Sequence, residues 1–363
     1  MRVRLAAFVA ATLVACVSAT ASAEPLDSAL ERLVLDPGCH PGGGWAADNS
    51  GQTPSAACKP DNASFKRLMS QYAFAFAPQA MHSARTTGYG GFHLSIEADY
   101  TSISSDKAYW KNGTRGGVDP SNGASSSSND SVPSFLQLYS LKFRKGFGFG
   151  LELAGIIGFM PKTSMISGGA DVRWSVLEGL RTGLGGVLPD FSIGAGVRTV
   201  TGTPQFQLTI AGLDAQISKP LPIQDSQVLT PYIGYQYLWI FADSGLVDLT
   251  PGTDALRYCD YAGQNVPGNT DPDQRDPNNG QPVCRGNASP LDFNNNVAFK
   301  PARLERHRLI VGANYRYEMV MAGFQVLFDA LPPADAQNDD ADNADLKDEA
   351  RQYTLSFQLG AMF

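Results

Sequence analysis

The sequence predicts an all-β fold: a transmembrane, antiparallel, up-and-down β-barrel of about ten strands, preceded by an N-terminal extension. Three observations support this prediction. The chain of 363 residues begins with a segment typical of a secretory signal. From residue 88 onward, apolar and polar residues alternate in repeated runs, which is the period of a strand with one apolar face. All the long connections between these runs fall at odd-numbered places in the series.

Residues 1–23 are expected to be a signal peptide. Two arginines precede an apolar run from Leu5 to Val17, and residues 21–23 read Ala-Ser-Ala, small residues where a signal peptidase would cut. The run is too short for a transmembrane helix, so the mature chain would start at Glu24. A second interpretation stays open, because residues 13–16 resemble a lipobox that would make Cys16 a lipidated N-terminus.

Cysteine usage agrees with export. The chain has five cysteines, and without Cys16 four remain: Cys39, Cys58, Cys259 and Cys284. An even number in an exported chain indicates two disulfides, and four cysteines allow three pairings. The pairs Cys39–Cys58 and Cys259–Cys284 are favoured because each closes a short local loop. No CxxC motif is present and no Cys/His spacing suits zinc, so no metal and no cofactor are expected. A net charge of −7 argues against a nucleic-acid partner.

Residues 24–87 precede the first alternating run and are expected to form a periplasmic extension. Asn62 or Ser64 is a candidate cap for a short helix with one apolar face, made of Phe65, Leu68, Met69 and Tyr72. Residues 74–78 then look extended. The segment either covers the periplasmic mouth of the barrel or enters the barrel as a plug, and the alternation does not decide between the two.

Ten alternating runs follow within residues 88–363, the expected barrel domain. In chain order they lie at residues 92–101, 135–144, 147–159, 170–176, 191–198, 205–210, 233–241, 308–317, 320–329 and 353–363. Runs of about ten residues suffice for a tilted strand to cross a bilayer. A soluble sandwich also has alternating strands, but its strands average about five or six residues. A soluble sheet this aromatic also needs a matching inner sheet, whereas every run here carries the same pattern.

The connections differ greatly in length. The three long ones are residues 103–133, 244–301 and 332–350, whereas Lys145-Gly146 and Glu318-Met319 read as tight turns. All three long connections are odd-numbered in the series, so in an up-and-down barrel they lie at one end. Outer-membrane barrels have this asymmetry, with long loops outside and short turns in the periplasm. We therefore expect the long connections to be extracellular and the last residue to be periplasmic.

These features together resemble a family. A signal peptide, alternating strands and a final strand that ends in Phe363 make the chain similar to bacterial outer-membrane β-barrel proteins of the small, monomeric type. The resemblance implies a monomer in the outer membrane of a Gram-negative bacterium, in contact with its lipid. It also implies that the terminal strand, with Tyr353, Phe357 and Phe363, is the signal read by the barrel-assembly machinery. The resemblance says little about function, because this architecture serves many functions.

The same alternation assigns charged residues to the lumen. They are Glu97, Asp99, Lys142, Arg144, Glu152, Asp171, Arg173, Arg198, Arg306, Arg308, Arg316 and Asp329. Mixed charge in a narrow barrel indicates either a closed lumen filled by paired side chains or a small polar channel. A barrel of about eight strands has room only for side chains, so ten strands favour closure.

Two expectations concern register. If Glu318-Met319 is a two-residue turn, Arg308 faces Asp329 directly across the strands, a favourable pairing of opposite charges. Asp214 is an even number of residues from Phe206, Leu208 and Ile210, so an unbroken strand would place it on the same face as these apolar residues. If that face points at lipid, the charge of Asp214 is costly there. We therefore expect a β-bulge near Ala211-Gly212 that reverses the parity of the residues after it.

The sequence offers no reacting constellation, so no catalytic residue and no enzyme are expected. The histidines are His40, His82, His93 and His307, and the parity of His307 points it toward lipid. No Gly-x-Ser-x-Gly motif is present. The predicted function is that of a non-enzymatic surface or envelope protein whose large extracellular loops bind a partner. The alternative is a narrow pore for small polar solutes, which would require a continuous, unblocked lumen.

Overall fold

The protein is a closed β-barrel. The computed structural model describes residues 24–35, 59–117, 128–178, 188–224, 226–249, 259–261, 282–284, 296–335, 341–347 and 349–363. Ten strands form the wall: β1 Phe92–Ser102, β2 Phe135–Gly146, β3 Leu151–Phe159, β4 Ile166–Leu177, β5 Asp190–Thr201, β6 Phe206–Ser218, β8 Gln227–Ser244, β13 Ala302–Tyr317, β14 Val320–Asp329 and β15 Tyr353–Met362. Each pairs antiparallel with its neighbour in this series, and β15 pairs with β1 to close the barrel. The predicted up-and-down barrel of about ten strands is confirmed.

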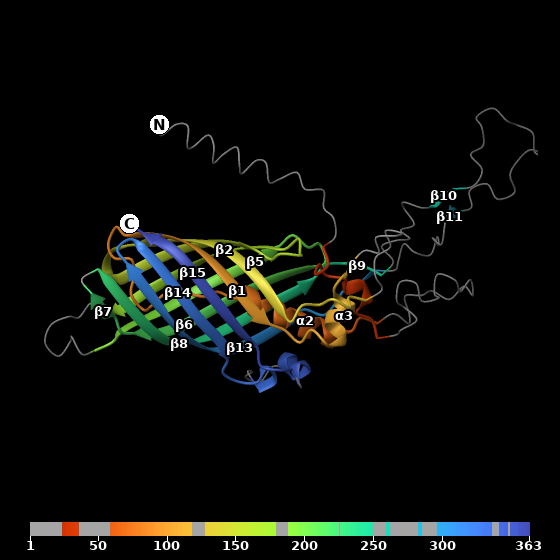
Figure 1. The fold of residues 1–363 in the computed structure, drawn as a ribbon. Coiled ribbons are helices and arrows are strands. Elements are labelled where there is room, and N and C mark those ends of the chain that lie inside the picture. Colours follow the sequence, from red (N-terminus) through yellow and green to blue (C-terminus); the bar gives the residue numbers. More distant parts are fainter. Residues whose placement is uncertain are drawn as a thin grey trace, which may run out of the picture.

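Short elements lie at the two ends of the wall. We call the end that carries the connections after β1, β8 and β14 the loop end, and the opposite end the turn end. At the turn end, β7 (Leu221–Gln224) pairs with β8. The loop-end connections contain α3 Ala108–Gly113, β9 Val247–Asp248, β10 Cys259–Tyr261, β11 Pro282–Cys284, β12 Asn296–Val297, η8 Pro333–Asp335 and η9 Ala341–Leu346. The C-terminus lies at the turn end, away from α3 (Figure 1). In the part of the chain that is described, no helix is long and apolar enough to cross a membrane.

The tight turns differ in one place from the prediction. The Glu318-Met319 turn is confirmed, since Tyr317 pairs with Val320 and Arg308 pairs in register with Asp329. The expected turn at Lys145-Gly146 is wrong, because β2 continues through Gly146 and the chain reverses in η4 (Gly148–Gly150). Phe149 sits in this turn with a φ of 62° and is 97% exposed. The aromatic side chain of Phe149 continues the apolar alternation of β3. The sequence pattern therefore did not reveal that the chain turns at this position.

The expected bulge in β6 is also wrong. The ladder is unbroken from Phe206 to Ser218 on the β8 side, and from Leu208 to Ser218 on the β5 side. Leu208 and Ile210 are fully buried, so their face of the strand points into the barrel rather than at lipid. Asp214 shares that parity and points inward without any shift. The apolar inner wall near the loop end exists because a helix fills this part of the barrel.

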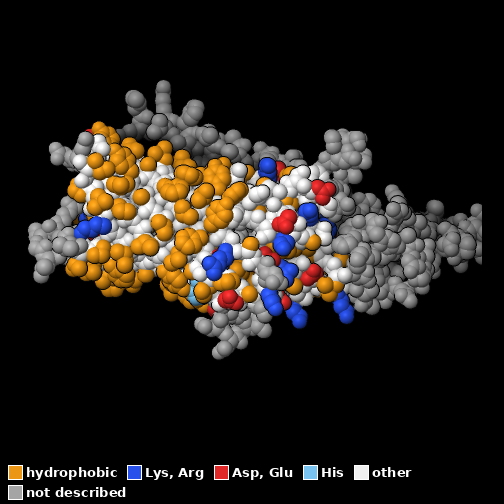
Figure 2. Space-filling model, turned by 60° about the horizontal axis from the view of Figure 1, so that its bottom comes forward, with side chains coloured by type: hydrophobic (Ala, Val, Ile, Leu, Met, Phe, Trp, Pro, Cys, Tyr) orange, Lys and Arg blue, Asp and Glu red, His pale blue; other side chains and the backbone are white. Residues whose placement is uncertain are grey.

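The outer wall is divided into two zones. Over the half of the barrel toward the turn end, apolar side chains gather in a band, and charged side chains appear toward the loop end (Figure 2). Ile96, Ile157 and Leu359 belong to the apolar zone and are more than 60% exposed. An apolar band on an outward face is what a bilayer requires of a transmembrane barrel. Asp243 and Arg303 lie on the outer wall toward the loop end, beyond this band, where they form an exposed ion pair.

A helix fills the loop half of the lumen. α2 spans Asn62–Phe76, and the Asp61 side chain caps it by accepting a hydrogen bond of 3.0 Å from the Ser64 N–H. The N-cap is therefore Asp61 and not Asn62 or Ser64. From Phe65 to Phe76 nearly every residue is buried, which is expected of a helix enclosed on all sides. The helix ends at Ala77 because Pro78 disfavours helical geometry at the residue before it.

Candidate functional site

The N-terminal segment runs along the whole barrel. Residues 24–34 lie at the loop end, where they contact the connections between strands. α2 follows inside the loop half, residues 77–84 pass through the turn half, and residues 85–91 lead into β1 at the turn end. We call residues 62–84 the plug. If the long connections are extracellular, residues 24–34 lie on the extracellular side and not in the periplasm, where the sequence analysis expects them.

Residues 24–34 are joined to three loop-end connections. The Asp27 carboxylate accepts hydrogen bonds from the N–H and the hydroxyl of Ser164, at 2.6 and 2.9 Å. The Leu30 N–H donates to the Gln205 side chain at 2.9 Å, and the Arg32 guanidinium donates to the Thr114 carbonyl at 3.3 Å. Arg32 itself is buried, and desolvation lowers the pKa of its guanidinium. The segment therefore closes the loop end as a bonded cap rather than a loose tail.

Side chains of α2 hold the long connections after β1 and β14. The Lys66 ammonium lies 2.9 Å from the Asp345 carboxylate, and Gln71 donates to both Tyr109 and Glu349, at 2.6 and 2.9 Å. The Tyr109 hydroxyl in turn donates to Glu349 at 2.6 Å. Burial, together with the Glu349 carboxylate, raises the pKa of this hydroxyl, so it stays protonated as a donor.

The connection after β8 also meets the helix. The Phe299 ring stacks on Phe65 with a centroid distance of 5.0 Å, and the Lys300 N–H donates to the Asn62 side chain at 2.7 Å. All three long connections thus reach α2, which positions them relative to one another.

Barrel-wall side chains hold the plug through its main chain from the last turn of α2 onward. Arg308 donates to the carbonyls of Phe74 and Pro78 at 3.2 and 2.7 Å. Lys142 donates to the carbonyls of Gln79 and Ala80 at 2.6 and 3.1 Å. Non-helical backbone inside a membrane protein needs such partners, because lipid supplies none.

More wall side chains do the same toward the turn end. The Asn314 side chain accepts from the Ser83 N–H at 2.8 Å and donates to the Met81 carbonyl at 3.2 Å. Ser175 donates to the Ala84 carbonyl at 2.9 Å. Amides, hydroxyls and cations of the wall therefore recognise the plug backbone along its length.

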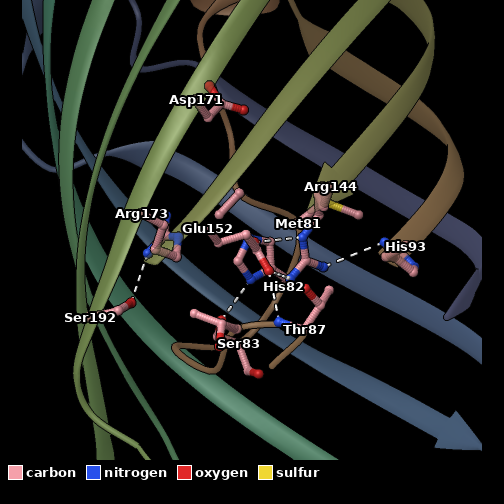
Figure 3. A network of polar contacts seen from close by, with 12 residues as sticks. Met81, His82, Ser83, Thr87, His93, Arg144, Glu152, Asp171, Arg173 and Ser192 are labelled. Atoms are coloured by element: carbon pink, nitrogen blue, oxygen red, sulfur yellow. Dashed lines mark hydrogen bonds and ion pairs between the residues drawn. The ribbon is translucent and has the colours of Figure 1, made fainter. Parts of the chain in front are cut away.

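A network of ion pairs surrounds this part of the plug. Arg144 binds the Glu152 carboxylate with two hydrogen bonds of 2.8 and 3.0 Å, and the His82 ring of the plug lies 3.5 Å from the same carboxylate (Figure 3). Arg173 donates to Ser192 at 2.8 Å and to Asp214 at 2.6 Å. The sequence predicts an inward Asp214 only through a β-bulge, whereas the unbroken strand already points it inward because the face of Leu208 and Ile210 lines the lumen.

Most of the charged residues expected in the lumen are buried inside the barrel. These are Glu97, Asp99, Lys142, Arg144, Glu152, Arg173, Arg198, Arg306, Arg308 and Asp329, and Asp171 is half-buried beside Arg198 at 2.7 Å. Arg316 is exposed at the turn end, where it donates to the Glu318 carbonyl at 3.0 Å. Glu97 lies 3.4 Å from the Lys142 ammonium.

Little space is left between the plug and the wall. A cavity of about 20 Å³ lies between residues 78–82 and the strands, with Lys142, Glu152 and Arg173 in its lining. This is room for about one water molecule. A larger cavity of about 550 Å³ opens at the turn end, where Arg85, Lys219 and Arg316 contribute to its lining. A vestibule at the turn end therefore leads up to the plug.

The predicted disulfides stay predictions. The backbones of Cys259 and Cys284 face each other as register partners of β10 and β11. Cys39 and Cys58 lie outside the described residues. In the terminal strand, Tyr353, Phe357 and Phe363 all face outward and are 40%, 49% and 64% exposed. Their part in barrel assembly likewise remains an expectation.

The histidines do not form a catalytic group with a nucleophile within the described residues. His82 and His93 are buried in the lumen, and His307 lies on the outer wall. The His307 ring is hydrogen-bonded to the Tyr235 hydroxyl and meets the Tyr237 ring edge-on at 4.7 Å. In the same parts of the chain, no group of three or more His, Cys, Asp or Glu residues could hold a metal ion.

Comparisons with known proteins find only distant similarity. No protein-family model matches the chain, and no curated protein matches it. Similar solved structures include Ail, the attachment invasion locus protein of Yersinia pestis, with 10% identity over 76% of this chain and 100% of that chain and a TM-score of 0.24. The outer membrane protein Omp33 of Acinetobacter baumannii has 8% identity over 76% and 98% of the two chains and a TM-score of 0.25.

The outer membrane protease OmpT of Escherichia coli is also similar, with 9% identity over 78% and 99% of the two chains and a TM-score of 0.21. At such values these similarities carry no argument about function. The architecture itself does identify the class, because closed, even-stranded, antiparallel barrels with an apolar outer band are proteins of the bacterial outer membrane. The protein is an outer-membrane β-barrel whose lumen is filled by its own N-terminal segment.

Proposed function

We propose that the protein is a non-enzymatic surface protein whose barrel is a closed anchor and whose loop end binds an extracellular partner. The observation that carries the proposal is the docking of all three long connections onto α2, through Lys66–Asp345, Gln71–Tyr109 and Phe65–Phe299. A surface whose parts are held in place before binding loses less conformational entropy when a partner binds. The proposal includes removal of residues 1–23 as a signal peptide and insertion by the barrel-assembly machinery.

The filled lumen supports the closed anchor. α2 occupies the loop half and buries its side chains against the inner wall, including Leu208, Ile210 and Ile240. Wall side chains bind the plug backbone beyond α2, and the cavity between residues 78–82 and the wall is only about 20 Å³. A solute would have to displace the plug, with its buried apolar surface and its hydrogen bonds, in order to pass.

Planar-bilayer recording tests this proposal. The purified, folded chain should insert without producing stable conductance steps, and vesicles containing it should not swell in solutions of small sugars. The loop end of the same preparation should keep its native protease resistance, which shows that silence is not due to unfolding. Stable conductance by the intact chain would contradict the closed anchor.

A narrow, gated pore is the second candidate. The observation that favours it is the vestibule of about 550 Å³ at the turn end, which leads up to the non-helical residues 77–84. Side-chain hydrogen bonds rather than strand pairing hold those residues, so they are the part of the plug most easily moved. Conductance that appears only in the presence of an extracellular ligand or an applied potential would favour this candidate over the first.

A further inference from the structure

The direction of the N-terminal segment is fixed at both ends of the barrel. At the loop end, the Leu26 N–H donates to the Lys162 carbonyl, and the Ala29 N–H donates to the Gly113 carbonyl, both at 2.9 Å. At the turn end, Phe92 exchanges backbone hydrogen bonds of 2.9 and 2.7 Å with Phe363 as β1 begins. Residues 62–84, which lie between these points in the sequence, therefore pass through the lumen from the loop end toward the turn end.

We propose that the barrel presents its own N-terminal segment at the cell surface, with the lumen serving as the conduit that the segment occupies. Residues 24–34 then lie on the extracellular side, in a single surface with the long connections, and β1 starts on the periplasmic side. This inference rests on the proposed function for the assignment of the long connections to the outside. Residues 24–34 are then a surface element in addition to the long connections.

Residues 24–34 are held by buried side chains at the loop end, and two neighbouring positions beside them are exposed. Leu26, Leu30 and Leu33 are buried against the apolar core around α2. Leu35 and Lys59 are exposed and lie side by side, with the Leu35 N–H donating to the Lys59 carbonyl at 3.0 Å. A side chain at either position is accessible from the loop side of the cap.

The turn-end exit is equally well defined. The Thr87 N–H donates to the Glu152 carboxylate at 2.8 Å, which ties the exit to the ion-pair network of the wall. A β-carbon at Gly91 would lie 2.1 Å from the Thr87 carbonyl oxygen, so this reversal into β1 requires glycine. The segment therefore leaves the lumen at the turn end and continues directly into β1.

Cysteine labelling on living cells tests the inference. Cys39, Cys58, Cys259 and Cys284 are first replaced by Ser. A single cysteine is then introduced by Lys59→Cys or Leu35→Cys in the N-terminal segment, by Asp106→Cys in the connection after β1, or by Phe149→Cys in the β2–β3 turn. All four positions are exposed. A membrane-impermeant maleimide is added before or after the outer membrane is permeabilised, and heat-modifiable migration on gels selects the folded variants.

We expect the Lys59→Cys and Leu35→Cys variants to react in intact cells as fully as Asp106→Cys, and Phe149→Cys to react only after permeabilisation. If Asp106→Cys reacts in intact cells while both N-terminal variants need permeabilisation, the inference is overturned but the proposed orientation of the loops stands. If Phe149→Cys reacts in intact cells and Asp106→Cys does not, the orientation fails, and the proposed function fails with it.

Discussion

Lumen cations bind the wall and the plug at the same time. Arg306 binds the Asp329 carboxylate at 3.0 Å and also donates to Ser70 of α2 and to Gln352, at 2.6 and 3.1 Å. Arg308 faces Asp329 in register, yet its guanidinium reaches Gln236 and two plug carbonyls instead. A buried guanidinium has five N–H groups to satisfy, so several acceptors serve it better than one carboxylate.

Alternation predicted which of these side chains face inward, because successive residues of a strand point to opposite sides. It did not predict their partners. An arginine side chain spans more than one register position, and the carbonyls that Arg308 binds belong to the plug and not to a neighbouring strand. Register alone therefore paired Arg308 with Asp329, where the structure pairs Arg306 with Asp329.

The buried Arg306–Asp329 pair gives a first prediction. Asp329→Asn should lower the free energy of unfolding by about 3–5 kcal/mol, because it leaves the buried Arg306 charge without its counterion. The matched control is Asp243→Asn, which breaks the Arg303–Asp243 pair across β8 and β13. Those side chains are 46% and 47% exposed, so the loss there should be at most about 1 kcal/mol. Urea unfolding in lipid vesicles measures both, and equal losses would refute the energetic difference.

At the scale of the element, β6 shows where alternation misleads. From Phe206 to Ile210 the apolar residues share one face, with Gln207 and Thr209 on the other, so composition alone assigns the apolar face to lipid. Leu208 and Ile210 in fact pack inward in the core that surrounds α2, while Leu213 and Ile217 are 50% and 45% exposed on the outside. In a barrel with a water-filled lumen, the face of β6 that carries Leu208 and Ile210 would have faced lipid, as the alternation suggests. That face was assigned wrongly because the sequence did not show that α2 lies inside the barrel.

The two faces of β6 give a second prediction. Ile210→Ala should cost about 2–5 kcal/mol, because it opens a cavity in a packed core. Leu213→Ala removes a similar volume from the same strand but should cost far less, because lipid chains fill the space. Both changes are measured by the same urea unfolding. A larger loss for Leu213→Ala than for Ile210→Ala would mean that the strand is inverted and that Asp214 faces lipid.

At the scale of the whole molecule, the barrel has two different interiors. The loop half is an apolar core around α2, and the turn half is a polar network around extended backbone. The number of strands and the position of the long connections were predictable because each depends on local alternation and chain order. The sequence left open whether the N-terminal segment covers the mouth of the barrel or enters it as a plug. Residues 62–84 have no strand pattern, and their hydrogen-bond partners are spread over the whole wall, so neither alternation nor chain order predicted their place.

Releasing the plug gives the last prediction. Arg308→Met removes the donor to the Phe74 and Pro78 carbonyls while keeping an apolar stem of similar length. Buried carbonyls without donors destabilise the plugged state, so the plug should leave the lumen part of the time and planar bilayers should show intermittent conductance. The control is Arg198→Met, which also removes a buried lumen cation. Among the residues that the structure describes, Arg198 donates only to wall groups, namely Asp171 and the carbonyls of Ala170 and Val197.

The control separates release of the plug from general loss of stability. Arg198→Met leaves Asp171 without its counterion and should therefore lower the free energy of unfolding at least as much as Arg308→Met does. It should nevertheless stay silent in bilayers, because no plug contact is lost. Conductance in both variants would mean that the lumen opens through the wall network, and silence in both would mean that the apolar contacts of α2 alone keep the barrel closed.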